Sequence, residues 1–82
     1  MKIPRDIGGE DLARLLGNYG YAISRQTGSH MRLTSSFKGT QHHVTIPLHT
    51  TLKIGTLNSI LKDVAVYLEI DRRQLVETLF PK

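Results

Sequence analysis

The residues with the clearest chemical capacity are four histidines, all in the middle of the chain. His30 follows Gly28 and Ser29, and the pattern predicts that it begins a strand directly after a glycine turn. A histidine in that place is held by backbone hydrogen bonds yet stays near solvent. Because imidazole exchanges protons near neutral pH, His30 is the first candidate for acid–base chemistry. The structural alternative is an ordinary surface histidine in a hairpin.

Other common kinds of site fit the residues less well. Adjacent residues of a strand point to opposite faces, so His42 and His43 do not readily share a metal ion. The chain has no cysteine, and its carboxylates lie only towards the two ends. Ser29 precedes His30, but no acid in the middle of the chain could orient a nucleophilic triad. No metal and no other cofactor is expected.

The charges are distributed unevenly along the chain. The net charge is +4, and residues 12–62 contain six Lys or Arg and no Asp or Glu. Such a region attracts phosphate polymers and acidic protein surfaces, although it is also compatible with a solvated basic surface. Histidine for proton transfer, with cations to stabilise negative charge, suits RNA cleavage, because the substrate's own 2′-hydroxyl supplies the nucleophile.

Three helices are expected around these residues. Apolar residues at helical spacing predict a first helix over residues 9–19, which Gly20 ends in a left-handed conformation. A second helix is expected from about Thr56, capped by Thr56 or Gly55. Asp71 is expected to cap a last short helix that runs to about Leu79.

Three strands are expected between the first two helices, over residues 21–26, 30–35 and 41–46, and Pro47 closes the last. The turn at residues 27–29 has Gly28 available for a positive φ. Strand alternation predicts which side chains face the core and which face away. The core set is Ile23, Met31, Leu33, Val44 and Ile46, and the outward set is Ser24, Gln26, His30, Arg32, Thr34, His43 and Thr45.

These elements predict an α+β fold in which a three-stranded antiparallel sheet is covered by helices on one face. The α-β-β-β-α order, with a short extra C-terminal helix, is the layout of double-stranded-RNA-binding domains. The open face would carry His30 and Arg32, with His43 across from them. At 82 residues, one domain over residues 1–82 is expected. No signal peptide or membrane span is recognised, so a cytoplasmic location is expected.

At this point the sequence resembles the HicA family of toxins from toxin–antitoxin pairs. The resemblance rests on an ordered set of segments that covers nearly the whole chain. These segments are Lys2-Ile3-Pro4-Arg5, Gly20-Tyr21, Arg25-Gln26-Thr27-Gly28-Ser29-His30, Val44-Thr45-Ile46-Pro47-Leu48-His49 and Gly55-Thr56-Leu57-Asn58-Ser59-Ile60-Leu61-Lys62. One departure is visible: relatives break with a glycine soon after the Ile-Leu-Lys segment, whereas residues 63–70 contain none.

The resemblance implies an endoribonuclease of toxin–antitoxin systems that cleaves mRNA, an mRNA interferase, with His30 as the essential histidine. It also implies a HicB-type antitoxin that binds the toxin and blocks that histidine. Contacts to RNA phosphates are expected from Arg32 and Lys53, because their surroundings lack acids. Ser29 and His49 are further candidates for RNA contacts, and Gly28 is expected to support the site through its turn.

Two alternatives remain open. The chain could bind RNA without cutting it, although duplex-RNA binders of this layout place a lysine cluster at the start of the second helix, where only Lys53 lies. It could also be an inactive half of a toxin–antitoxin complex. Growth on expression without a partner would separate this last alternative from an active toxin.

Overall fold

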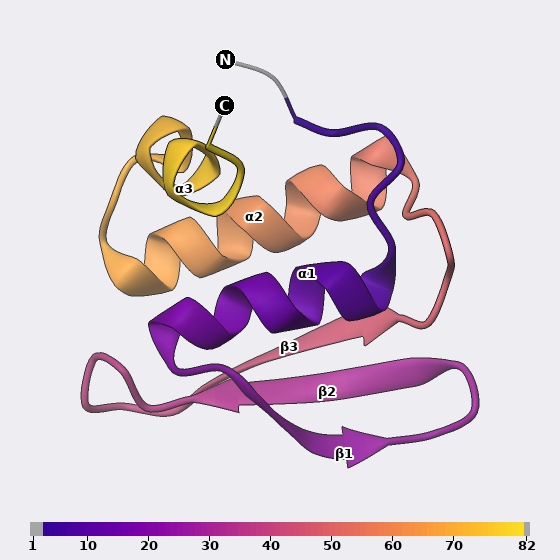
Figure 1. Ribbon diagram of the computed structural model, residues 1–82. Coiled ribbons are helices and arrows are strands. Elements are labelled where there is room, and N and C mark those ends of the chain that lie inside the picture. The colour runs from indigo at the N-terminus through magenta and orange to yellow at the C-terminus, as the bar shows by residue number, and fades with distance from the viewer. Residues whose placement is uncertain (1–2, 82) are drawn as a thin grey trace.

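The computed structural model describes residues 3–81. The fold has three layers, which are a sheet with one open face, a central helical layer and an outer helix (Figure 1). The elements, in chain order, are α1 (Gly9–Leu16), the 3₁₀ helix η1 (Gly17–Tyr19), β1 (Ala22–Gln26), β2 (His30–Ser35), β3 (His42–Pro47), α2 (Ile54–Leu68) and α3 (Arg72–Leu79). The predicted α+β class and order are therefore confirmed. No helix of residues 3–81 is long and apolar enough to cross a membrane.

The sheet is an antiparallel meander in the order β1-β2-β3, so β2 is paired on both sides. Figure 1 shows α1 and α2 over the same face of the sheet, with α3 beyond α2. Within residues 3–81, the opposite face carries no helix. This arrangement leaves the outward side chains of all three strands accessible to a large ligand.

The core lies between the sheet and the helices. Most of the side chains assigned to it from periodicity are buried, including Met31 and Leu33 of β2, which are almost fully enclosed. The buried residues of α2 recur at helical spacing along one side of it and are Leu57, Ile60, Leu61, Val64, Ala65 and Leu68. Burial of this size supplies the main driving force for folding.

A bulge in β1 overturns part of the predicted strand alternation. The register pairs Ile23 with Leu33 and Arg25 with Arg32, so Ser24 is an extra residue between them. Both bulge residues then share the open face. Gln26, which was expected to point outward, lies on the helix face opposite Met31 instead, and Arg25 takes the outward position.

Ile23 was also predicted to be a core residue, and this was wrong. It does lie on the helix-facing side, beside a hollow of about 400 Å³ between α1 and β1. However, β1 is an edge strand and the hollow beside Ile23 is not filled by side chains, so Ile23 remains 51% exposed.

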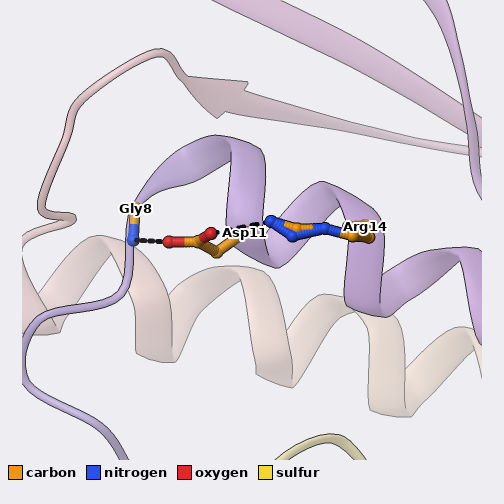
Figure 2. Close-up of polar contacts among 3 residues, drawn as sticks. All are labelled: Gly8, Asp11 and Arg14. Carbon is orange, nitrogen blue, oxygen red and sulfur yellow. Dashed lines mark hydrogen bonds and ion pairs between the residues drawn. The ribbon is translucent and has the colours of Figure 1, made fainter.

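The start of α1 is fixed against the end of β3. The carboxylate of Asp11 accepts a hydrogen bond from the Gly8 backbone N–H at 3.1 Å and pairs with Arg14 at 2.8 Å (Figure 2). A Cβ atom on Gly9 would lie 2.1 Å from the carbonyl oxygen of Pro47. Only glycine permits this approach of helix to strand, and it sets the position of the loop that follows β3.

The helix boundaries differ in detail from those predicted. α1 ends at Leu16 and its last turn is the 3₁₀ helix, after which Gly20 adopts the left-handed conformation as expected, with φ of 80°. α2 begins at Ile54 with Lys53 as its N-cap, two residues before the predicted Thr56. Lys53 makes no side-chain capping hydrogen bond within residues 3–81, which explains why capping residues did not locate the start of α2.

The C-cap of α2 is Glu69, at a position where helices commonly have a glycine. This residue adopts the left-handed conformation, with φ of 61°, and its N–H bonds the carbonyls of Ala65 and Val66. A non-glycine residue in this region is strained by its Cβ atom. The segment that departs from the family pattern therefore continues the helix and ends it without glycine.

Asp71 occupies the N-cap position of α3 as predicted, but its side chain makes no capping hydrogen bond. The Arg72 guanidinium donates to the Asn58 side-chain oxygen of α2 instead. This contact and the buried Leu75 and Val76 hold α3 on α2.

Candidate functional site

The imidazole of His30 is exposed at the first position of β2, on the open face of the sheet. Its Nδ1 atom lies 2.8 Å from the hydroxyl oxygen of Ser29. Within residues 3–81 no hydrogen-bond partner is recorded for Nε2. One ring nitrogen is thus held by the protein, and the other is open to a ligand.

The hydroxyl of Thr27 organises the turn before His30. It accepts hydrogen bonds from the backbone N–H groups of Ser29 at 3.2 Å and His30 at 3.1 Å. The Thr27 N–H in turn donates to the His30 carbonyl at 2.9 Å, which closes the hairpin. The local sequence therefore positions His30 through a threonine as well as through the strand.

Gly28 does not play the conformational part expected of it. The described glycines with positive φ are Gly20 and Gly39, so Gly28 is not left-handed. A Cβ atom on Gly28 would meet nothing within 4 Å. The expectation of a positive φ in this turn was wrong, because the Thr27 hydroxyl stabilises the turn in its place.

Arg32 lies on the same face as His30, two residues along β2, and is exposed. The register places Thr45 of β3 beside it on one side and Arg25 of β1 on the other. No strand contains an Asp or a Glu. The open face is therefore basic, and within residues 3–81 neither arginine has an ion pair.

A chain of polar side chains crosses the three strands farther along the same face. The Ser24 hydroxyl lies 2.8 Å from that of Thr34, which lies 2.7 Å from Nδ1 of His43. His43 pairs in register with Thr34, whereas His30 pairs with Pro47. His43 shares the open face with His30 as expected, but it lies four residues away along β2, or about 13 Å at the rise of a strand.

His49 and Lys53 lie outside the sheet, in the connection from β3 to α2. His49 lines a hollow of about 370 Å³ with Glu10 and Asp11 at the start of α1. Its carbonyl accepts a hydrogen bond from the Gly9 N–H at 2.9 Å. Lys53 is the exposed N-cap of α2. Neither side chain makes a recorded hydrogen bond to His30 within residues 3–81.

A second histidine cluster, which the sequence did not reveal, joins the beginnings of β1 and β3 to α2. Nδ1 of His42 lies 2.6 Å from the Tyr21 hydroxyl, and its Nε2 lies 3.3 Å from the Asp63 carboxylate. Tyr67 stacks on the His42 ring, with the ring centroids 4.7 Å apart. Burial raises the pKa of Tyr21, and Tyr67 and Asp63 add to the effect.

The Tyr67 hydroxyl extends this cluster to the loop between β2 and β3. It donates to the Thr40 carbonyl and accepts from the Lys38 N–H. One signal in the sequence could have pointed to the cluster: a tyrosine entering a strand next to the core needs a partner for its hydroxyl. Asp63 and Tyr67 both belong to the glycine-free segment 63–70, and this segment therefore secures the loop.

No group of three or more His, Asp or Glu side chains within residues 3–81 is arranged to hold a metal ion. The polar groups on the open face are two histidines, two arginines and hydroxyls. Such a set can transfer protons and neutralise an anion. The open face is therefore a basic surface with one fixed histidine at its edge.

Comparison with protein families identifies the class of protein to which the chain belongs. The family model described as the HicA toxin of bacterial toxin–antitoxin systems matches residues 9–66, which include α1, the whole sheet and most of α2. The protein is therefore one of the toxins of toxin–antitoxin systems. Within that class, the chain belongs to the HicA family. No match to the chain was found among curated proteins or solved structures.

Proposed function

We propose that this toxin is a metal-independent endoribonuclease that cleaves mRNA in the cytoplasm, with His30 as its proton-transfer residue. The observation that carries the proposal is the state of the His30 ring. Ser29 engages Nδ1, and Nε2 is accessible on a basic face that is free of acids. An open face rather than a deep cleft suits a polymer substrate.

The reaction needs no nucleophile from the protein. The 2′-oxygen of the substrate attacks the adjacent phosphorus, the bond from phosphorus to the 5′-oxygen breaks, and the products end in a 2′,3′-cyclic phosphate and a 5′-hydroxyl. The 2′-hydroxyl loses its proton and the leaving oxygen gains one. His30 carries one of these transfers at Nε2, and Arg32 stabilises the added negative charge on the phosphate.

The direction of the hydrogen bond between Ser29 and His30 decides which tautomer of the His30 ring is present. When Nδ1–H donates to the serine oxygen, Nε2 holds a lone pair and accepts a proton. When the serine hydroxyl donates to Nδ1, Nε2 carries the hydrogen and is a donor. Ser29 acts in this proposal by positioning His30. Lys53 and His49 extend the RNA contact surface beyond the end of β3.

Membership of a toxin–antitoxin family implies an antitoxin partner. We propose that this partner is of the HicB type and that it covers the open face around His30. Because His30 is exposed, a bound protein that occupies the start of β2 blocks the ring without any change in the fold. The antitoxin would then inhibit the toxin by competing with RNA.

The decisive experiment measures RNA cleavage in EDTA by the purified wild type and by His30→Ala, with circular dichroism and thermal unfolding to confirm that both are folded. An all-DNA strand of the same sequence is the matched substrate control, since it lacks the 2′-hydroxyl. We expect the wild type to cut RNA and leave DNA intact, and the mutant to be inactive or nearly so.

The other outcomes are equally informative. Equal cutting by both proteins means that His30 is not the catalyst or that a contaminating nuclease is present. If neither protein cuts but both bind RNA, the chain is an RNA-binding module. Cleavage of DNA at a comparable rate contradicts the 2′-hydroxyl mechanism.

A further inference from the structure

We propose that the open face of the sheet is a track for single-stranded RNA, in which Arg25 and Arg32 bind phosphates beside the cleavage site and His43 forms a subsite farther along the strand. The inference rests on the proposed nuclease function and adds to it a substrate form and three binding positions. Its residues lie on the face that carries no helix (Figure 1).

The pairing of two arginines is the first observation. Arg25 and Arg32 are directly opposite in register, both are exposed, and within residues 3–81 neither has an acidic partner. Like charges opposite one another weaken a sheet. Phosphates of one strand bound to each arginine would remove that cost, and arginine matches phosphate geometry through paired donors.

The bulge is the second observation, and it is independent of charge. Without an extra residue at this point, strict alternation would put Ser24 and Arg25 on opposite faces. The bulge puts both on the open face, where Ser24 bonds the Arg32 carbonyl at 3.1 Å and Arg25 stands beside Arg32. Bulges commonly redirect side chains next to active sites. Here the redirected residue adds a cation to the face that holds His30.

The third observation concerns His43. Thr34 engages its Nδ1 atom, and Ser24 in turn engages Thr34, so the ring is oriented by a chain of hydroxyls. The distance of about 13 Å along the sheet is too great for His43 and His30 to serve one phosphate. A polynucleotide lying along β2 reaches both. His43 therefore fits a binding position on the RNA and not a second proton-transfer group.

The geometry favours a single strand over a duplex. Three strands are only about 10 Å wide, whereas duplex-binding domains contact two minor grooves over about 16 base pairs. The cations of this face lie on the sheet, not in a cluster at the start of α2. A flexible strand also lets its 2′-hydroxyl line up with the leaving oxygen, as the proposed reaction requires.

Salt dependence of binding tests the arginine positions without any need for cleavage. A short 2′-O-methyl oligouridylate, which cannot be cut by the proposed reaction, is titrated by fluorescence anisotropy at several KCl concentrations. Each phosphate contact on a single strand contributes about 0.7 to the slope of log K against log salt. We expect Arg25→Ala and Arg32→Ala each to reduce the slope by that amount, and Arg25→Lys to retain it.

Arg73→Ala is the matched control, because it removes the same charge from the exposed surface of α3, beyond the helical layer. Its slope should equal that of the wild type. An unchanged slope in Arg25→Ala overturns the track. The track is also overturned if a duplex of the oligomer with its complement competes for the protein more strongly than the unlabelled single strand. It is likewise overturned if the arginine variants lose binding of the antitoxin but keep binding of RNA.

His43 is tested by steady-state cleavage with two variants. His43→Ala should raise KM while kcat and the shape of the pH profile are preserved, and His43→Gln, which keeps a hydrogen-bonding side chain, should restore much of the affinity. A fall in kcat with loss of one limb of the pH profile makes His43 a proton-transfer group and overturns the subsite.

The two levels of inference fail separately. If the wild type never cuts RNA but the slopes change as expected, the nuclease proposal fails and the RNA track stands. If the wild type cuts and the slopes do not change, the nuclease proposal stands and the track fails.

Discussion

The hydrogen bond between Ser29 and His30 is the single contact with the most direct bearing on the proposed chemistry. Loss of one neutral hydrogen bond costs about 0.5–1.5 kcal/mol, which corresponds to at most about tenfold in rate. We therefore expect Ser29→Ala to lower kcat by about threefold to tenfold, while Ser29→Thr retains most activity. Steady-state kinetics measure both effects.

A different result would change the role of Ser29. If Ser29→Ala is as inactive as His30→Ala, the serine contacts the substrate itself. The controls are the unfolding temperatures of the variants, which should match the wild type because Ser29 is exposed.

Gly28 gives a second prediction at the same scale. Its φ is not left-handed and the space around its Cβ position is empty, so Gly28→Ala should change the free energy of unfolding by no more than about 0.5 kcal/mol. Chemical denaturation measures this value. A clear loss of stability contradicts the geometry of the turn. Lost cleavage in a stable variant shows that RNA passes close to this backbone.

At the scale of the elements, the end of α2 is a place where stability can be gained. Glu69 is left-handed, a conformation that costs a non-glycine residue about 1 kcal/mol or more. Its ion pair with Lys38, at 3.4 Å, is exposed and contributes little. We expect Glu69→Gly to raise the free energy of unfolding by about 0.5–1 kcal/mol, as measured by urea denaturation.

The control for this prediction is Glu69→Ala, which removes the same charge but keeps a Cβ atom. It should not stabilise the protein. Equal stabilisation by both variants would attribute the effect to charge and contradict the argument from backbone conformation.

The elements also show where sequence reasoning stops. Helical spacing and strand alternation located six of the seven elements, and the 3₁₀ helix η1 was not recognised as a separate element. They succeed because burial of an apolar face imposes a period on the chain. The bulge at Ser24 breaks that period without any glycine or proline to mark it. For this reason the outward position of Arg25 could not be predicted, whereas those of His30 and Arg32 could.

At the scale of the whole molecule, the contacts that the sequence could not supply are those between distant segments. Tyr21, His42 and Asp63 meet through hydrogen bonds that each span 21 residues. Neither charge nor periodicity singles out His42 from the other histidines. The position of His30 after the hairpin turn could be predicted because Thr27, Ser29 and His30 are close in the sequence, while this cluster depends on the assembled fold.

That cluster leads to a prediction about alkaline stability. The pKa of Tyr21 is raised above its ordinary value of 10.0, mainly by burial, so the folded state holds this proton more tightly than the unfolded state. Its contribution is fully present below about pH 10 and is lost as the pH rises towards the folded pKa. The free energy of unfolding should therefore fall above pH 10.0 by up to about 1.4 kcal/mol per pH unit from this group.

Tyr21→Phe isolates this effect. The variant lacks the hydrogen bond to His42 and should be less stable near neutral pH by about 1 kcal/mol. Above pH 10.0 its stability should decline less steeply than that of the wild type. Urea denaturation over an alkaline pH series compares the two declines. Parallel declines would show that Tyr21 is not protected from ionisation.

The bulge in β1 also determines how the chain tolerates changes in length. Removal of Ser24 would join Ile23 directly to Arg25, and the remaining residues would then alternate with Ile23 opposite Leu33, Arg25 opposite Arg32 and Gln26 opposite Met31. No other side chain of β1 would cross the sheet. A one-codon deletion at this position would remove the Ser24 hydroxyl but leave every other side chain of β1 on its present face. A deletion inside β2 would instead reverse part of that strand.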